Sequence, residues 1–285
     1  MRILILLFLP LFSLAQGTDI YLFDLQVSGS SIVLSNAKNI TNRKGYDNQP
    51  RFHSTRPFIY YSSGIDSVTN DIMRFNWQTN ETVNLTRSKE QKFSPTVTPD
   101  GKYISAILLR TNKVQDLIKF PVNGGKEEVV VGDLKVGYHA WIDADRLLLF
   151  VLANDSLNQL HDVDIKKKTD KIIADNPGRS LHKMPGENAF SFVQKSKNGK
   201  PLLKRYDPVT GGISIIVELP NKAEDVAWTA NGMLLVSEDD HILSYDAKQQ
   251  KWDRVKIDGD IGFLKKVTRM TVSADGKKLA LVAAE

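Results

Sequence analysis

Cysteine is absent from the 285-residue sequence. This absence excludes disulfide bonds, thiolate metal sites, cysteine nucleophiles and a lipid anchor on an N-terminal cysteine. Hydrophobic residues make up 41% of the chain and charged residues 25%, proportions that exclude a disordered or collagen-like chain. Packing and hydrogen bonds alone must therefore stabilise the fold.

Long hydrophobic runs are also scarce. The apolar segment from Ile3 to Phe12 follows Met1-Arg2 and precedes Ser13-Leu14-Ala15, whose small residues suit a signal peptidase. A buried N-terminal strand or a membrane anchor is the alternative, but a membrane span takes about 20 apolar residues. We therefore predict a signal peptide over residues 1–16, no membrane span, and a soluble protein in the periplasm or outside the cell.

The excess of positive charge is small, with 38 Lys+Arg against 33 Asp+Glu. In an exported protein, so mild a basic balance argues against nucleic acid as a partner. The sequence also lacks a glycine-rich phosphate loop, an H-E-x-x-H zinc motif, a G-x-S-x-G elbow and a twelve-residue calcium loop. No catalytic residue and no cofactor is assigned on this basis.

A strand–turn–strand pattern is what the sequence does contain, most clearly from Ser94 to Ile104 around Pro99-Asp100-Gly101. Asp-Gly supplies the left-handed backbone conformations of a tight hairpin. Weaker copies recur along the chain at intervals of 43 to 45 residues, with the turn residue at Thr55, Asp100, Ala144, Glu187, Asn231 and Asp275. Each copy has room for four short strands, and such a period is typical of a propeller blade.

The predicted fold is therefore all-β, a six-bladed β-propeller with four-stranded antiparallel blades. The last copy holds only two strands, and the missing two are found near the N-terminus. We expect this blade to be shared between residues 18–36 and 263–285, which closes the ring and covers the open sheet edges. Residues 17–285 then form a single domain.

The second copy carries a family resemblance. Asn84-Leu85-Thr86, then Ser94-Pro95, Thr98 to Lys102 and Asp116 are similar to the WD-like repeat of TolB-type propellers. Asn39-Ile40-Thr41 with Gln49 to Phe52 repeats the pattern. The chain differs from TolB itself in lacking a preceding α/β domain, and from propeller-bearing peptidases in lacking a hydrolase domain, so neither activity is carried over.

Candidate site residues follow from the repeat, because the first strand of each blade lies next to the central channel. The position of Pro95 is occupied in the other copies by Pro50, His139, His182, Val226 and Met270. The position before it holds Gln49, Ser94, Tyr138, Leu181, Asp225 and Arg269. We predict a polar pocket in the channel, with the candidate binding residues Asn48, Tyr138, His139, His182, Asp225 and Arg269.

Three interpretations of these residues remain open. Two imidazoles and one carboxylate suit a transition metal, so His139, His182 and Asp225 are also a candidate metal site. They resemble, in this respect, propeller lyases that use channel histidines with a metal on pectin fragments. Alternatively, the residues bind a sugar or an acid without a metal, or are only hydrogen-bonded residues facing a water-filled channel.

The functional hypothesis is an exported, non-catalytic binding propeller of the cell envelope. It presents its loops and channel mouth to a protein, peptide or glycan, and we expect it to be a monomer. A metal-assisted polysaccharide lyase or hydrolase is the first alternative. A structural module of an envelope complex is the second.

Overall fold

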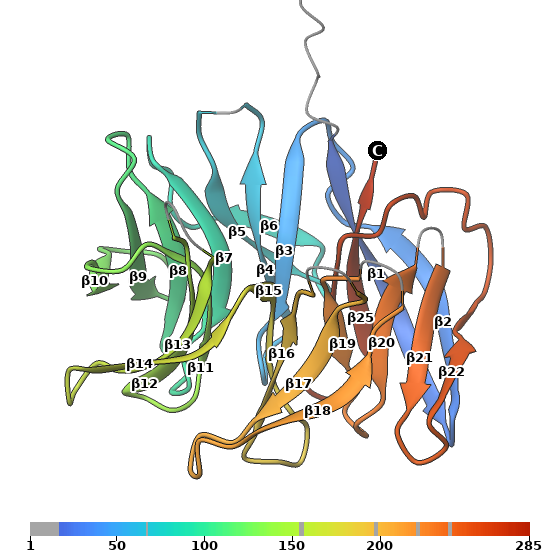
Figure 1. Ribbon diagram of the computed structural model, residues 1–285. Helices are drawn as coiled ribbons and strands as arrows, with labels where there is room; N and C mark the ends of the chain where they lie inside the picture. Colours follow the sequence, from blue (N-terminus) through green and yellow to red (C-terminus); the bar gives the residue numbers. More distant parts are fainter. Residues whose placement is uncertain (1–16, 67, 154–156, 197–198, 221–222, 239–240) are drawn as a thin grey trace, which may run out of the picture.

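Strands make up the regular structure of the protein. The computed structural model describes residues 17–285 except 67, 154–156, 197–198, 221–222 and 239–240. These residues form twenty-five strands and no helix, and the sheets stand side by side in sequence order (Figure 1). The all-β class expected from the sequence is confirmed. The predicted signal peptide, residues 1–16, lies outside the described residues.

Four of the sheets are four-stranded and antiparallel, and each consists of consecutive strands. The first two contain β7 (Gln91–Val97), β8 (Tyr103–Leu109), β9 (Gln115–Pro121) and β10 (Glu128–Val131), then β11 (Val136–Trp141), β12 (Arg146–Val151), β13 (Gln159–Asp164) and β14 (Thr169–Asp175). The next two contain β15 (Pro177–Lys183), β16 (Phe190–Gln194), β17 (Leu202–Tyr206) and β18 (Ile213–Glu218), then β19 (Val226–Trp228), β20 (Leu234–Glu238), β21 (His241–Asp246) and β22 (Lys251–Arg254).

Both ends of the described chain meet in a fifth sheet of nine strands. Its strands are β1 (Thr18–Ser28), β2 (Ser31–Asn39), β3 (Tyr46–Phe52), β4 (Phe58–Gly64), β5 (Asp71–Asn76), β6 (Glu81–Asn84), β23 (Lys256–Ile257), β24 (Arg269–Val272) and β25 (Lys278–Ala284). Strands β24, β25, β1 and β2 form one antiparallel group, in which β1 pairs with β25 along seven residues. Strands β3 to β6 form another. A single bridge between Thr18 and Tyr46 joins the two groups.

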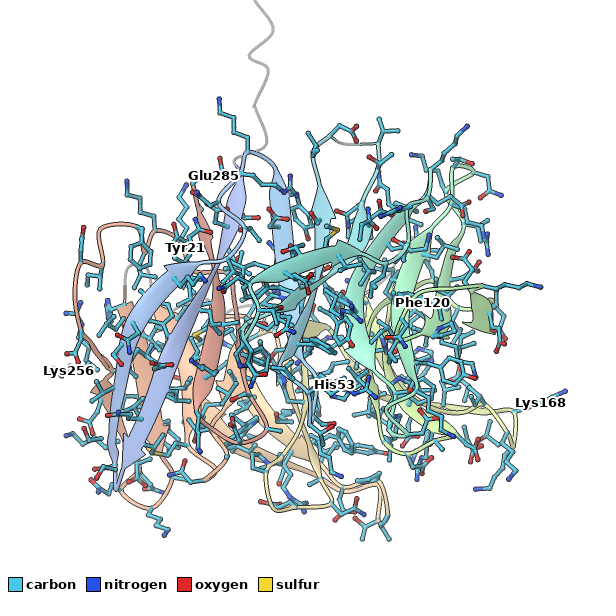
Figure 2. All side chains as sticks on the ribbon, turned by 180° about the vertical axis from the view of Figure 1, so that it is seen from behind. Tyr21, His53, Phe120, Lys168, Lys256 and Glu285 are labelled. Carbon is cyan, nitrogen blue, oxygen red and sulfur yellow. The ribbon has the colours of Figure 1, made fainter. Side chains whose placement is uncertain are left out.

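The hydrophobic core lies between neighbouring sheets. The second strand of a group is covered on both faces. In β8, every residue from Ile104 to Leu108 is buried, and all of them except Ser105 are apolar. The last strand of a group is mostly exposed, as in β14. Figure 2 shows this contrast, with Phe120 (1% exposed) among the packed sheets and Lys168 and Lys256 at the periphery.

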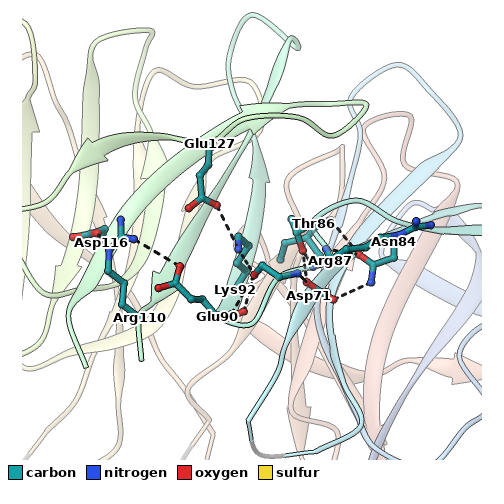
Figure 3. A network of polar contacts seen from close by, with 11 residues as sticks. Asp71, Asn84, Thr86, Arg87, Glu90, Lys92, Arg110, Asp116 and Glu127 are labelled. Atoms are coloured by element: carbon teal, nitrogen blue, oxygen red, sulfur yellow. Dashed lines mark hydrogen bonds and ion pairs between the residues drawn. The ribbon is translucent and has the colours of Figure 1, made fainter. Parts of the chain in front are cut away.

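Polar contacts stabilise each group where the repeat signature recurs. Asp71 at the start of β5 accepts hydrogen bonds from Thr86 Oγ1 (2.6 Å) and Asn84 Nδ2 (2.9 Å) (Figure 3). The same clamp recurs at Asp19, Asn39 and Thr41. Beside it, the buried Lys92 lies 3.4 Å from Glu127. The Asn-x-Thr signature thus anchors the loop after the fourth strand to the third strand.

Strand β23 is an addition to this repeating plan. It leaves the connection after β22 and pairs in parallel with β2, with Val33 opposite Lys256 and Leu34 opposite Ile257. The outer edge of β2 is therefore covered, and the Asp258 amide donates a further bond to the Leu34 carbonyl (2.8 Å). This strand reinforces the group in which the chain ends pair.

Candidate functional site

The first strands of the groups surround the centre of the molecule. They contact one another in the order β3, β7, β11, β15, β19, β24 and back to β3. Each of β3, β7, β11 and β15 carries an irregularity in its pairing with the following strand. Such bulges re-aim side chains, and here they turn polar groups toward the centre.

Two of these bulges place non-glycine residues in the left-handed region, Gln49 at φ 58° and Ser94 at φ 54°. This conformation is uncommon for residues with a Cβ and persists only where the surroundings hold it. Gln49 Oε1 accepts hydrogen bonds from Ser62 Oγ (2.9 Å) and from the Ser94 amide (2.7 Å). The two bulges are therefore locked to each other across neighbouring strands.

A small cavity of about 40 Å³ lies among the first strands, and we call it the arginine pocket. This volume admits a few water molecules or the end group of a ligand. Its lining comprises Gln49, Pro50, Arg51, Ser94, Thr96, Tyr138, His139, Arg179, Leu181, His182, Asp225, Arg269 and Met270.

The structure brings together five of the six candidate residues predicted from the sequence: Tyr138, His139, His182, Asp225 and Arg269. The sixth, Asn48, is absent from the lining. Its Oδ1 accepts a hydrogen bond from the amide of the next residue, Gln49 (2.8 Å), at the bulge of β3. The structure therefore places Asn48 beside the bulge of β3 and outside the lining of this pocket.

Arg51 and Arg179 are lining residues that the repeat pattern did not single out. Arg51 stands one position after the column of His139, and Arg179 stands three residues before His182. The bulges shift these residues into the pocket, and a bulge cannot be read from equal spacing. The only signal was an arginine close to the predicted column.

Asp225 and Arg269 form the one ion pair between described lining residues, at 3.7 Å. Arg269 also donates to Tyr138 Oη (3.2 Å) and lies over its ring at 5.4 Å. Asp225 Oδ2 accepts the Met270 amide (2.9 Å). Burial raises the pKa of Asp225, while Arg269 opposes that rise. The carboxylate is thus held in place by one cation and one backbone donor.

The remaining cations have different partners. Arg179 lies 3.5 Å from Glu224, outside the pocket lining. Arg51 forms no ion pair with any described carboxylate, and its Nη1 lies 3.4 Å from His182 Nδ1. Burial lowers the pKa of Arg51, although a guanidinium keeps its proton at neutral pH. With three arginines against one aspartate, the pocket carries net positive charge.

Hydrogen-bond counting fixes the tautomer of His139. Ser105 Oγ contacts Trp141 Nε1 (2.9 Å), the Thr96 carbonyl (3.0 Å) and His139 Nε2 (2.7 Å). A hydroxyl has one proton and two lone pairs. The indole must donate and the carbonyl must accept, so Nε2 must also donate. The proton of the neutral ring is therefore on Nε2, and Nδ1 carries a lone pair.

His182 adopts the same tautomer. Arg51 can only donate, so His182 Nδ1 accepts, and Nε2 donates to Ser180 Oγ (2.8 Å). Burial lowers the pKa of His139 to about 3, and the Arg51 charge lowers it as well. Burial and the same arginine lower the pKa of His182. Both rings are therefore neutral at pH 7.

The candidate metal ligands do not converge. Among the residues that the structure describes, no three histidine, aspartate or glutamate side chains form a group suited to a metal ion. His139 Nε2 and His182 Nδ1 are engaged by Ser105 and Arg51, and the Arg51 cation beside both rings disfavours a second cation. The metal alternative for His139, His182 and Asp225 gains no support from the geometry.

A wider cavity of about 370 Å³ adjoins the arginine pocket, and we call it the apolar cavity. Five residues line both cavities and form the waist between them: Arg51, Thr96, His139, Leu181 and His182. The rest of its lining is mainly apolar and consists of Val97, Pro99, Ala140, Trp141, Ile142 and Lys183. A cationic, hydrogen-bonding waist thus lies beside an apolar wall.

Comparison with known proteins relates the chain to others through its fold. No protein-family model matches the sequence, and no curated protein matches it. A solved structure described as TolB from Agrobacterium tumefaciens has a TM-score of 0.70 at 12% identity, covering 95% of this chain and 99% of that one. Within the described residues, no helix has the length and apolar character needed to cross a membrane.

Two further solved structures are similar. An oligogalacturonate lyase in complex with manganese has a TM-score of 0.60 at 13% identity, covering 90% of this chain and 83% of that one. A chain of a nidogen/laminin complex has a TM-score of 0.61 at 11% identity, with 84% and 94% covered. The TolB-like β-propeller fold expected from the repeat signature is thereby confirmed, and the likeness concerns the fold alone.

Proposed function

We propose that the protein is a non-catalytic binding module of the cell envelope, which engages its partner at the mouth of the central channel. The observation that carries this proposal is the arginine pocket, where three guanidinium groups and one carboxylate line a single small cavity. A pre-formed concave site with a few convergent polar groups is typical of ligand binding. The net positive charge of the pocket favours an anionic group on the partner.

The proposed architecture is a six-bladed ring whose last blade combines residues 18–36 and 263–285. The pairing of β1 with β25 and the cyclic order of contacts among the first strands support it. In this proposal residues 17–285 are one monomeric domain, and residues 1–16 direct export to the periplasm or the medium.

The partner is a protein, peptide or glycan, and nucleic acid is not expected. A similar propeller is part of the nidogen/laminin complex, which supports a protein as the partner. The alternative is a metal-assisted lyase, because a similar propeller is an oligogalacturonate lyase bound to manganese. A structural role within an envelope complex is a further alternative.

Retention of envelope components on the immobilised protein tests the proposal. An Arg179→Gln/Arg269→Gln variant removes two pocket charges, while Arg87→Gln/Arg254→Gln removes two from the exposed surface as a matched control. We expect the wild type and the control to retain the same component in equal amounts. The pocket variant should bind it at least about tenfold more weakly, because hydrogen bonds to charged groups are lost. Equal retention by all three would place the interface elsewhere.

Catalysis is tested on the same preparation. The purified protein is incubated with oligogalacturonate and Mn²⁺, and unsaturated products are followed by ultraviolet absorbance. If the wild type forms no more product than His139→Gln, the result agrees with a binding module. Turnover that requires His139 would replace the proposal with the lyase alternative.

A further inference from the structure

The waist combines a cation, a hydrogen-bond acceptor and an adjacent apolar wall. Arg51 and His139 line both cavities, and Trp141 and Ile142 line the apolar cavity next to them. A ligand that reaches the waist from the apolar cavity therefore meets three kinds of surface within one small region.

Arg51 supplies the cation. It makes no ion pair with a described carboxylate, and the nearby Asp225 is already engaged by Arg269 and the Met270 amide. A guanidinium in such a partly buried place binds a carboxylate through two parallel hydrogen bonds, and this arrangement is strong and selective.

His139 supplies the acceptor. The ring is 4% exposed, and its Nδ1 is buried without a hydrogen-bond partner. Because Nε2 donates to Ser105, Nδ1 carries a lone pair. A buried acceptor without a hydrogen bond costs free energy, which a ligand donor would recover. His139 lines both cavities, so its ring lies next to any ligand held at the waist.

We propose that the waist binds the free carboxyl terminus of a peptide or protein whose last side chain is apolar. The terminal carboxylate pairs with Arg51, the N–H of the last residue donates to His139 Nδ1, and the last side chain packs against Trp141 and Ile142. This inference rests on the proposed function and specifies its partner.

A sugar acid offers the same carboxylate but fits the apolar cavity less well. Its ring hydroxyls would face Val97, Trp141 and Ile142 without partners, and burying unpaired hydroxyls is unfavourable. A peptide end instead carries one carboxylate, one N–H and one apolar side chain on a single α-carbon, which matches the three features of the waist.

Titration calorimetry with acetylated Gly-Gly-Leu tests the proposal on the wild-type protein. We expect the free acid to bind about tenfold more tightly than the C-terminal amide, because the amide lacks the charge that Arg51 recognises. Replacing the last N–H by an ester oxygen should weaken binding about fivefold, and Gly-Gly-Ser should bind more weakly than Gly-Gly-Leu. These comparisons change only the peptide, so they do not depend on whether a protein variant folds.

Two variants assign the contacts. Arg51→Gln should abolish the preference for acid over amide. His139→Gln retains a donor near Ser105 but removes the ring acceptor. It should therefore abolish the preference for the peptide with the last backbone N–H over the peptide with an ester oxygen at that position. Arg205→Gln, outside the channel, should keep both preferences.

Equal binding of acid and amide by the wild type, or no peptide binding at millimolar concentration, would overturn the inference. Binding of galacturonate that depends on Arg51, without peptide binding, would overturn it too. Either result leaves the proposed function standing if the Arg179→Gln/Arg269→Gln variant still loses its envelope component. Failure of that retention experiment would remove the proposed function itself.

Discussion

The pocket histidines show how burial fixes the protonation of single residues. The pKa of His139 is lowered to about 3 and that of His182 is also lowered, both mainly by burial. The ordinary value is about 6.5. The unfolded chain therefore takes up protons below pH 6.5 that the folded chain does not, so stability falls with decreasing pH over that range. Asp225, whose pKa is raised by burial, acts in the opposite direction, because its contribution to stability is present at low pH and is lost as the pH rises.

Urea unfolding at pH 4 to 7 with a chelator present measures this effect. We expect the free energy of unfolding to fall between pH 6.5 and 4, by up to about 1.4 kcal/mol per pH unit for each buried histidine. His139→Gln should reduce the slope by about one proton, because glutamine does not titrate. An unchanged slope in His139→Gln would show that this ring is not held neutral by the fold.

Individual channel residues were predictable from the sequence only where the repeat spacing is regular. His139, His182 and Asp225 occupy corresponding positions of the repeat, so equal spacing identifies them. Arg51 and Arg179 lie outside those positions and line the pocket at the bulges of β3 and β15, which depend on the neighbouring strand rather than on spacing. The free charge of Arg51, on which the peptide proposal depends, therefore became visible only in the structure.

At the scale of elements, hairpins were the most predictable feature. Thr98 Oγ1 donates to Asp100 Oδ1 (2.6 Å), and Gly101 takes φ 69°, so the turn chemistry is contained in a few adjacent residues. Strand β23 was not predicted, because Lys256-Ile257 has no strand pattern of its own. Its strand conformation comes from pairing with β2, a strand more than 200 residues away in the sequence.

Ile257→Ser tests whether β23 stabilises the group formed by the chain ends. Ile257 is half-buried and packs on the core cluster around Phe23 and Leu34. We expect its loss to lower the free energy of unfolding by about 1–2 kcal/mol. The same change at Ile215, which is 62% exposed, should cost less than about 0.5 kcal/mol. Equal effects at both positions would mean that β23 adds no stability.

Considered as a whole, the molecule depends on strand β1, which pairs with β25 on one side and β2 on the other. Its Ile20 is fully buried among residues from both ends of the chain. The pairing of distant segments couples the sheets, so we expect one cooperative unfolding transition in spite of the repeating plan.

Ile20→Ala tests this coupling. We expect a loss of about 3 kcal/mol with a single transition that coincides in tryptophan fluorescence and circular dichroism. Ile65→Ala, at an 83% exposed position, is the matched control and should change little. Separate transitions for the two probes would show that the sheets unfold independently of the chain ends.

Site-specific photo-crosslinking in producing cells tests most directly whether a partner binds at the channel. A benzoylphenylalanine at Lys183, an exposed residue that lines the apolar cavity, should capture the partner. The same probe at Val129, 54% exposed on the outer strand β10, should capture nothing specific. Capture at Lys183 that disappears with Arg51→Gln is the result we predict, and capture at Val129 alone would contradict a channel-binding module.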